Sequence, residues 1–356
     1  MSLQFVFGNS GSGKSDYLYQ SILEEAEREP EKNFLLLVPE QFTMQTQREL
    51  VCRQPNHAIM NVDVLSFVRL AYRVFDDLGM QDLVILEETG KNLVLRKVAE
   101  LKKKELSVLG GNLNKMGYIG EIKSLISEMA QYNITPEDLG AFLGGQDVGD
   151  TLRCKMQDIL TMYEGFREYI DGKYITAEEI LDILCRELPR SEMLKNSVIF
   201  LDGYTGFTPV QYRIVELFIT HALDVVCAVT VDYGADPYRE SGIQNLFYMS
   251  KHTVCRLAAM AKAGGGELKE DVILDRRPAW RFAQSPALDF LEQNLYRYNG
   301  RAWKGEQDQV KLFCGQTPEE EVRYVKSRIE SLVREQGLRY RDMAVVTGDL
   351  AAYGRE

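Results

Sequence analysis

The chain has 356 residues, of which 45% are hydrophobic and 27% are charged, and its formal net charge is -11. This length allows two or three domains, each with its own core. The acidic balance excludes a protein that coats nucleic acid through a generally basic surface, although it leaves room for a locally basic groove. No apolar run has the length of a membrane span, and the first residues lack a signal-peptide pattern, so we expect a cytoplasmic protein without a membrane partner.

The six cysteines are scattered, and no two of them stand at the C-x-x-C spacing that zinc and cluster sites use. Most lie in apolar contexts such as VVCAV, where a reduced cysteine behaves as a small core residue. We therefore expect no zinc or iron–sulfur site within these 356 residues.

Strand and helix patterns alternate at the start of the chain and again after residue 197, which is the order that a parallel α/β sheet produces. The expected elements are a strand at 3–7, a helix over about 15–26, a strand at 34–38, a helix from Thr43, a strand at 61–65 with an amphipathic helix after it, a strand at 197–202, a helix from Pro209 and a strand at 224–232.

Between residues 83 and 189 the apolar residues follow helical spacing instead. Two helix starts in this region are marked by capping residues, Thr135 before Pro136 and Thr176 with Glu179. The stretch FLGGQDVGD at 142–150 is typical of a loop.

These patterns predict three parts. We expect a discontinuous α/β domain at 1–82 and 190–300, a helical domain inserted at 83–189, and the beginning of a second α/β domain at 301–356. In the last part, the strand patterns QVKLFCG (309–315) and DMAVVT (342–347) flank a helix at 319–336. The second domain is not finished at residue 356, so we expect the chain to be the N-terminal part of a larger protein.

The most specific motif is GNSGSGKS, which fits the phosphate-binding pattern G-x-x-x-x-G-K-[ST]. It stands between an expected strand and an expected helix, where loop N–H groups and the helix N-terminus face phosphate oxygens. Lys14 is expected to reach the β- and γ-phosphates of ATP, and Ser15 to ligate Mg²⁺. The residues expected to bind the nucleotide here are Gly8, Asn9, Ser10, Gly11, Ser12, Gly13, Lys14 and Ser15.

Asp202 follows the apolar strand SVIFL. In this class of site, an Asp at the end of a neighbouring strand holds Mg²⁺ through water. The alternative is a strand-end aspartate that caps the next helix. We favour the Mg²⁺ role, which makes Ser15 and Asp202 the expected metal ligands and ATP with Mg²⁺ the expected cofactors.

Taken together, these stretches resemble the UvrD/RecB group of superfamily 1 helicases, and within it the B subunits of bacterial AddAB helicase–nucleases (AddB). The similar stretches are GNSGSGKS (8–15), VPEQFT (38–43), VDVLSFVRLAYRV (62–74), LDGYTGFTPVQ (201–211) and DMAVVTGDLAAY (342–353). The resemblance implies a P-loop NTPase of the RecA-like fold, with an inserted helical domain and the start of a second RecA-like domain. It also implies an AddA-type motor subunit as partner in a heterodimer that processes double-strand DNA ends. A nuclease and an iron–sulfur cluster would lie beyond residue 356.

The resemblance also assigns residues. Gln211 matches the later glutamine of the acidic motif and joins the nucleotide-binding set. Single-strand grooves combine backbone contacts with aromatic stacking, although Phe42 and Phe67 are equally compatible with core positions. The residues at positions where relatives grip single-stranded DNA are Gln41, Phe42, Thr43, Ser66, Phe67 and Arg69.

One departure from the resemblance concerns catalysis. The helicases carry Asp-Glu at the acidic motif, whereas Asp202 is followed here by Gly203, and no carboxylate stands between Asp202 and Gln211. Losing the base that orients the attacking water costs roughly 10²–10⁴-fold in rate. The adenine-reading glutamine is also missing, because only Gln4 precedes the loop. We therefore assign no catalytic residue and expect a chain that binds ATP but hydrolyses it poorly.

Two other functions are compatible with these residues. One is a working helicase motor whose base comes from elsewhere, and the other, from a different class, is a P-loop kinase of a small molecule. DNA-stimulated ATP turnover would distinguish the motor from an ATP-binding scaffold, and a kinase would need a phosphoryl acceptor.

Overall fold

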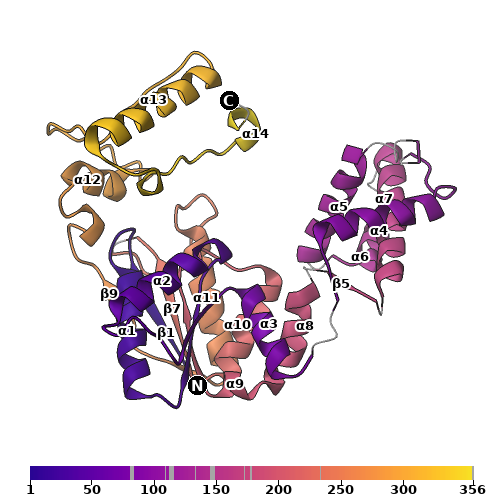
Figure 1. Ribbon diagram of the computed structural model, residues 1–356, viewed down its shortest axis with the longest axis horizontal. Helices are drawn as coiled ribbons and strands as arrows, with labels where there is room; N and C mark the ends of the chain where they lie inside the picture. The colour runs from indigo at the N-terminus through magenta and orange to yellow at the C-terminus, as the bar shows by residue number, and fades with distance from the viewer. Residues whose placement is uncertain are drawn as a thin grey trace. The chain divides into compact units, whose positions relative to one another are not determined.

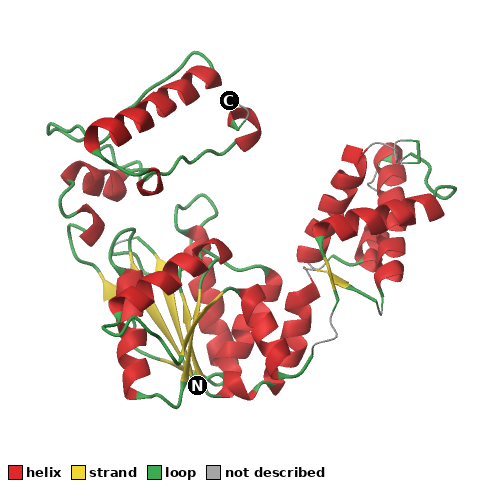
Figure 2. Ribbon diagram, viewed as in Figure 1, coloured by secondary structure: helices red, strands yellow, loops and turns green. Residues whose placement is uncertain are grey.

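The computed structural model describes residues 1–80, 84–108, 110–111, 116–132, 134–144, 149–171, 173–176, 179–232 and 234–354. It divides into two units, Met1–Arg281 and Phe282–Glu356, and each is described here by itself. Figure 1 shows the elements in chain order, and Figure 2 shows the same view coloured by secondary structure.

A parallel β-sheet forms the centre of the first unit (Figure 2). Its strands follow the order β3-β2-β6-β7-β1-β8, and β9 also pairs with β1. Apolar strands such as SVIFL are typical of a parallel sheet that is covered on both faces. The strands are β1 (Ser2–Gly8), β2 (Asn33–Leu37), β3 (Val62–Leu65), β6 (Ser197–Leu201), β7 (Asp224–Thr230), β8 (Glu267–Leu268) and β9 (Val272–Leu274).

Helices pack on both faces of this sheet, because alternate residues of each strand point to opposite sides. On one face, Leu35 and Leu37 of β2 join a core with α3, α8, α10 and α11. On the other face, Phe34 and Leu36 pack with α1 and α2. The α-helices associated with the sheet are α1 (Lys14–Arg28), α2 (Thr43–Arg53), α3 (Phe67–Asp77), α8 (Glu179–Glu187), α9 (Glu192–Lys195), α10 (Pro209–His221) and α11 (Tyr248–Ala263).

The segment between α3 and α8 has a hydrophobic core of its own, formed by α4 to α7. The expected capping residues are confirmed, because Asp138 N–H donates to Thr135 Oγ1 at 3.2 Å and Thr176 N–H donates to Glu179 at 2.8 Å. The expected boundary at 82–83 and residues 145–148 of the expected loop lie outside the described residues. The elements are β4 (Ile85–Leu86), α4 (Glu88–Leu101), α5 (Met116–Gln131), α6 (Pro136–Leu143), α7 (Asp150–Ile170) and β5 (Ile175–Thr176), with β4 and β5 paired in parallel.

Helix α8 falls within the expected helical domain but packs with the sheet. Its residues Ile180, Ile183 and Leu184 are buried in the same core as α3 and α10. The helices that share the separate core are therefore α4 to α7.

The second unit contains α12 (Pro286–Asn294), α13 (Pro318–Gln336) and α14 (Leu350–Tyr353). The expected helix at 319–336 is confirmed by α13, but the strands expected at 309–315 and 342–347 are wrong, since neither segment is a strand. A strand needs a neighbour to pair its N–H and C=O groups, and none of the described residues provides one for these segments. Their apolar side chains are consequently exposed, with Leu312 at 99% and Val346 at 93%.

None of the described helices combines the length and the apolar character that crossing a membrane requires.

Candidate functional site

The carboxyl ends of the central strands bring two predicted segments to one edge of the sheet. Gly8 at the end of β1 pairs with Thr230 of β7, and Leu201 at the end of β6 pairs with Cys227 of the same strand. The loop after β1 and Asp202 after β6 therefore emerge at the same edge, separated by β7. In open α/β sheets, this edge is where ligands bind.

The predicted phosphate loop connects β1 to α1. Its last glycine, Gly13, precedes the helix with a φ of 96°, a left-handed conformation that glycine adopts without steric cost. Asn9 and Ser12 are buried within the loop, and Ser10 is exposed. Among the described residues, Ser12 Oγ has no hydrogen-bond partner. The loop thus presents a compact backbone turn and a buried hydroxyl at the N-terminus of a helix.

The Lys14 side chain lies over this loop. Its Nζ donates hydrogen bonds to the carbonyl oxygens of Gly8 and Asn9, at 3.0 Å and 2.9 Å. Hydrogen bonds between two charged groups are stronger than those to neutral carbonyls. A phosphate bound in the loop would therefore compete well for the ammonium group.

The Asp202 carboxylate is buried and faces the first turns of α1. Burial raises its pKa, and hydrogen bonds from the Ser15 hydroxyl, the Gly203 N–H and the Tyr19 hydroxyl, together with the charge of Lys14, act in the opposite direction. The Ser15 hydroxyl and the Asp202 carboxylate are hard oxygen groups, which suit Mg²⁺. Mg²⁺ is usually bound through one or two carboxylates together with waters and substrate phosphates, and this pair fits that pattern.

The residue after Asp202 departs from ordinary backbone geometry. Gly203 has a φ of 78°, and a Cβ atom added there would lie 3.3 Å from Cδ of Pro39. The expected nucleotide-binding residue Gln211 lies in the first turn of α10, where its Oε1 accepts from Thr208 N–H at 2.9 Å. Its side chain therefore caps its own helix.

The six candidate DNA-binding residues divide into exposed and buried groups. Gln41 and Phe42 lie in the exposed 3₁₀ turn Glu40–Phe42, and the Phe42 side chain is 46% exposed. Thr43, Ser66 and Phe67 are buried, with Phe67 only 3% exposed. Of the two interpretations of Phe67, the core position is the one observed.

An aromatic cluster explains this burial. The ring of Phe67 lies 5.5 Å from Tyr204, 6.1 Å from Phe207 and 6.5 Å from Phe218, measured between centroids. Aromatic rings at these separations attract one another and exclude water. Phe67 therefore joins the segment after Asp202 to the helices α3 and α10.

Glu40 was not singled out by the sequence, and it binds two of the candidate DNA contacts. Arg69 Nε donates to Glu40 Oε1 at 3.0 Å, and the Ser66 hydroxyl donates to Glu40 Oε2. The hydrogen bond from Ser66 and the charge of Arg69 lower the pKa of Glu40. Ser66 also caps α3 through Arg69 N–H at 3.3 Å. The only sequence signal for Glu40 is its place after β2, at the same sheet edge.

Trp280 is a second residue that sequence reasoning missed. A Cβ atom added to Gly13 would lie 3.3 Å from Cδ1 of Trp280, and the Arg281 N–H donates to the carbonyl oxygen of Gly11 at 3.2 Å. The guanidinium carbon of Arg276 lies 3.4 Å from the Trp280 ring centroid. This arginine-rich segment therefore runs along the loop and leaves the indole 61% exposed. Its sequence, RRPAWRF, carries no spacing that would place it there.

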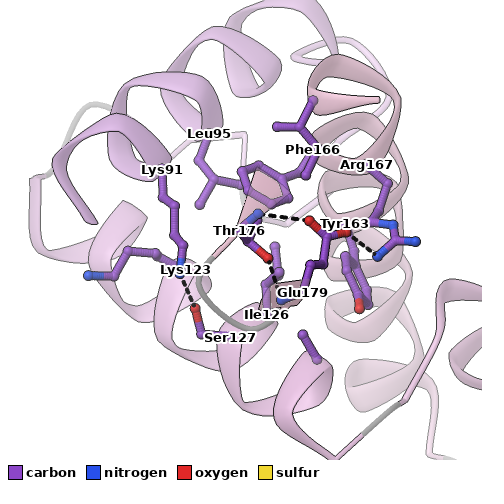
Figure 3. Close-up of a pocket in the computed structure, with 12 residues that line it drawn as sticks. Lys91, Leu95, Lys123, Ile126, Ser127, Tyr163, Phe166, Arg167, Thr176 and Glu179 are labelled. Atoms are coloured by element: carbon purple, nitrogen blue, oxygen red, sulfur yellow. Dashed lines mark hydrogen bonds and ion pairs between the residues drawn. The ribbon is translucent and has the colours of Figure 1, made fainter. Parts of the chain in front are cut away.

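A cavity of about 20 Å³ lies elsewhere, among α4, α5, α7 and the start of α8 (Figure 3). Its polar groups are paired: Lys91 Nζ lies 3.0 Å from Glu88 and 3.5 Å from Ser127 Oγ, and Arg167 lies 3.0 Å from Glu179. A space of this size holds about one water molecule. We therefore regard it as part of the packing between helices.

Comparisons with known proteins agree on one family. The family described as "ADDB, N-terminal" matches residues 5–292. Three relatives, each named as the B subunit of an ATP-dependent helicase/deoxyribonuclease, match 99% of the chain: those of Lachnoclostridium phytofermentans at 40% identity, Clostridium tetani at 32% and Alkaliphilus oremlandii at 31%. The chain spans 30–31% of the length of these relatives. The chain belongs to the ADDB N-terminal family.

Proposed function

We propose that this chain is the nucleotide-binding and single-stranded-DNA-binding N-terminal region of the B subunit of an ATP-dependent helicase–nuclease. Its first unit would be a RecA-like P-loop domain with α4 to α7 inserted, and its second unit the beginning of another RecA-like domain. The names of the relatives support a role in a DNA-processing complex. Its partners would be an AddA-type motor subunit and double-strand DNA ends that enter recombinational repair.

One observation carries the nucleotide part of the proposal, namely that Lys14, Ser15 and Asp202 meet at the carboxyl edge of the sheet. The loop N–H groups and Lys14 would hold the phosphates, and Ser15 and Asp202 would hold Mg²⁺. Bound Mg²⁺ would neutralise phosphate charge. The exposed indole of Trp280 beside Gly13 provides a flat apolar surface on which a base can stack.

We expect weak ATP hydrolysis because the residue next to Asp202 is a glycine. Gly203 carries no side chain, so no base comes from the position next to Asp202. The carboxylate of Glu40 lies at the same edge, but Ser66 and Arg69 already bind it and lower its pKa. Without a positioned base, we expect turnover to be lower by roughly 10²–10⁴-fold than in a complete site.

The DNA part of the proposal relies on the exposed turn after β2. Gln41 and the half-exposed ring of Phe42 are free to meet a strand, and Arg69 lies close enough to share Glu40 with Ser66. Bases stack on aromatic rings regardless of sequence, while cationic groups follow the phosphates. We therefore expect binding without strong base preference at this turn.

The proposal is tested by measuring the rise in melting temperature that Mg–ATP produces and the rate of ATP turnover. Lys14→Ala should abolish the rise in melting temperature that Mg–ATP produces, because the loop loses its charge-assisted contact to the phosphates. Lys32→Ala, which removes a surface lysine paired with Glu29, should leave that rise unchanged. ATP turnover is measured in parallel, with and without single-stranded DNA.

Each outcome has a separate meaning. A melting shift that survives Lys14→Ala would remove the nucleotide-site assignment. Rapid DNA-stimulated turnover that disappears in Lys14→Ala would show a working motor whose base lies outside the segment after Asp202. Tight ATP binding with negligible turnover is the result that we expect.

A further inference from the structure

Trp280 is held beside the loop between β1 and α1 by the backbone on both sides of it. Ala279 before it is fully buried, and the N–H of Arg281 after it donates to the carbonyl oxygen of Gly11 at 3.2 Å. The Trp280 side chain itself is 61% exposed. The chain therefore fixes the position of a large aromatic side chain and leaves its ring in contact with solvent.

Two contacts determine which parts of the indole are accessible. A Cβ atom added to Gly13 would lie 3.3 Å from Cδ1 and 3.9 Å from Nε1, so the loop meets only one edge of the five-membered ring. The guanidinium carbon of Arg276 lies 3.4 Å from the ring centroid and covers one face of the indole. Because most of the side chain is still exposed, its other face and the six-membered ring remain accessible.

This position suits the base of a nucleotide whose phosphates lie in the loop. Only a ribose separates the base from the phosphates, and Gly13 is the last loop residue before α1. Nucleobases stack on the flat faces of aromatic side chains. The positive charge of Arg276, which lies over the same indole, also favours an anionic ligand close to the loop.

The glutamine that precedes the loop is engaged elsewhere. Gln4 Nε2 donates to the carbonyl oxygen of Glu270 at 2.9 Å, which ties this side chain to the segment before β9. Hydrogen bonds to the edges of bases distinguish one base from another, whereas stacking tolerates every base because each has a π-face. A base held by Trp280 would therefore be bound through its ring surface, and purines offer the larger surface.

We propose that Trp280 binds the base of the nucleotide by stacking, and that the site accepts purine nucleoside triphosphates with little preference between adenine and guanine. This inference rests on the proposed nucleotide-binding function. The loop would select the triphosphate, and the accessible face of the indole would select a flat purine ring. Specificity would thus depend on the phosphates and not on the edge of the base.

The indole can report on its own occupancy, because the chain has only two tryptophans. In Trp303→Phe, Trp280 is the single tryptophan, and its fluorescence is followed during titration with Mg–ATP, with Mg–GTP and with inorganic triphosphate in the presence of Mg²⁺. We expect ATP and GTP to quench it with dissociation constants within about threefold of each other, and triphosphate to bind with little quenching.

Calorimetry on the 356-residue chain measures what the ring contributes to affinity. Trp280→Leu keeps an apolar side chain without an aromatic face, and it should weaken ATP and GTP binding by about tenfold while triphosphate binding stays the same. Trp303→Leu is the matched control, on a tryptophan whose ring lies 5.5 Å from that of Phe290, and it should change none of the three affinities. The melting temperature confirms that each variant is folded.

Unchanged ATP affinity in Trp280→Leu overturns the proposal. Equal weakening of ATP and triphosphate also overturns it, because the segment would then shape the loop and not bind the base. A strong preference for ATP over GTP would show that polar groups read the edge of the base, and quenching of Trp280 by single-stranded DNA without nucleotide would assign the indole to DNA; either result overturns the proposal. If the unsubstituted chain binds neither ATP nor triphosphate, the proposed function fails as well.

Discussion

Gly203 follows Asp202 at the position where we expect a helicase to carry its catalytic glutamate, and its backbone has a conformation that suits glycine. Its φ of 78° is a conformation that other residues rarely adopt, and Pro39 occupies the space beside it. Its N–H also acts to lower the pKa of the Asp202 carboxyl group, against the effect of burial. Restoring a carboxylate at this position therefore conflicts with the geometry that supports Asp202.

We expect Gly203→Glu to lower the free energy of unfolding by about 1–3 kcal/mol, because a left-handed non-glycine residue is strained. We also expect no gain in ATP turnover. Urea unfolding and steady-state hydrolysis measure the two effects. Gly203→Ala shares the backbone strain without the carboxylate and is the matched control. Higher turnover in Gly203→Glu, absent from Gly203→Ala, would show that the loop can rearrange around a base.

Substitutions of Phe42 and Phe67 distinguish a residue that contacts DNA from a residue that packs in the core. Phe67→Ala should lower the free energy of unfolding by about 3–5 kcal/mol, since it empties a site inside an aromatic core. Phe42→Ala should leave stability within about 0.5 kcal/mol, because it removes a half-exposed ring. It should weaken single-stranded DNA binding instead, by about 1–3 kcal/mol for one lost stacking platform. Denaturant unfolding and fluorescence anisotropy measure the two properties.

Results that reverse this pattern would contradict the assignment. A Phe42→Ala chain that binds DNA normally would place the strand elsewhere. A Phe67→Ala chain of normal stability would mean that the aromatic cluster does not support the fold.

At the scale of residues, the sequence correctly placed a loop between β1 and α1, and phosphate binding by its glycines, lysine and serine stays a prediction. It could not predict which aromatic residue is buried, since Phe42 and Phe67 both follow strands and both begin helical segments. Phe67 is buried because its ring packs against Tyr204, Phe207 and Phe218. These three residues lie far from Phe67 in the sequence. Trp280 was missed for the same reason, because its place on the loop depends on the course of the chain after β9.

At the scale of elements, the alternation of strands and helices was predictable because buried strands such as β2 and β6 consist largely of consecutive apolar residues. The short strands β8 and β9 were missed, as they have two and three residues and little pattern. The segments at 309–315 and 342–347 have strand-like composition without a partner, which shows that composition does not supply the hydrogen bonds a strand needs.

Helix α4 carries a buried lysine, and its contribution to the helical core is testable. The Lys91 side chain is enclosed at the contact of α4 with α5, whereas its ion-pair partner Glu88 stays largely exposed. Replacing Lys91 removes no solvation from Glu88, so no unpaired charge is left buried. The lysine stem should therefore matter more for packing than its charge.

We expect Lys91→Met to change the free energy of unfolding by less than about 1 kcal/mol, because an apolar residue of similar volume replaces a paired charge. Lys91→Ala should cost about 2 kcal/mol or more through the cavity that it leaves. Urea unfolding of both variants distinguishes volume from charge. Equal losses in the two variants would mean that the polar contacts of Lys91 with Glu88 and Ser127, and not the filled space, stabilise the helical core.

For the molecule as a whole, the two units differ in how much of their apolar surface is covered. The first unit contains three hydrophobic cores, with the loop, Asp202 and Trp280 all inside residues 1–281. The helix α13 of the second unit has no buried residue, and Leu312, Val346 and Leu350 are exposed. Contiguous exposed apolar surface favours association with other hydrophobic groups.

This contrast predicts the behaviour of a chain shortened to residues 1–281. We expect it to keep the melting temperature of the main transition and the stabilisation by Mg–ATP, because the cores and the proposed nucleotide site lie within it. It should lose most of the fluorescence of a bound hydrophobic dye, since the exposed segments of the second unit are gone. Calorimetry and dye titration on both chains measure these effects. Loss of Mg–ATP stabilisation in the shortened chain, with its fold intact by circular dichroism, would mean that residues 282–356 contribute to the nucleotide site.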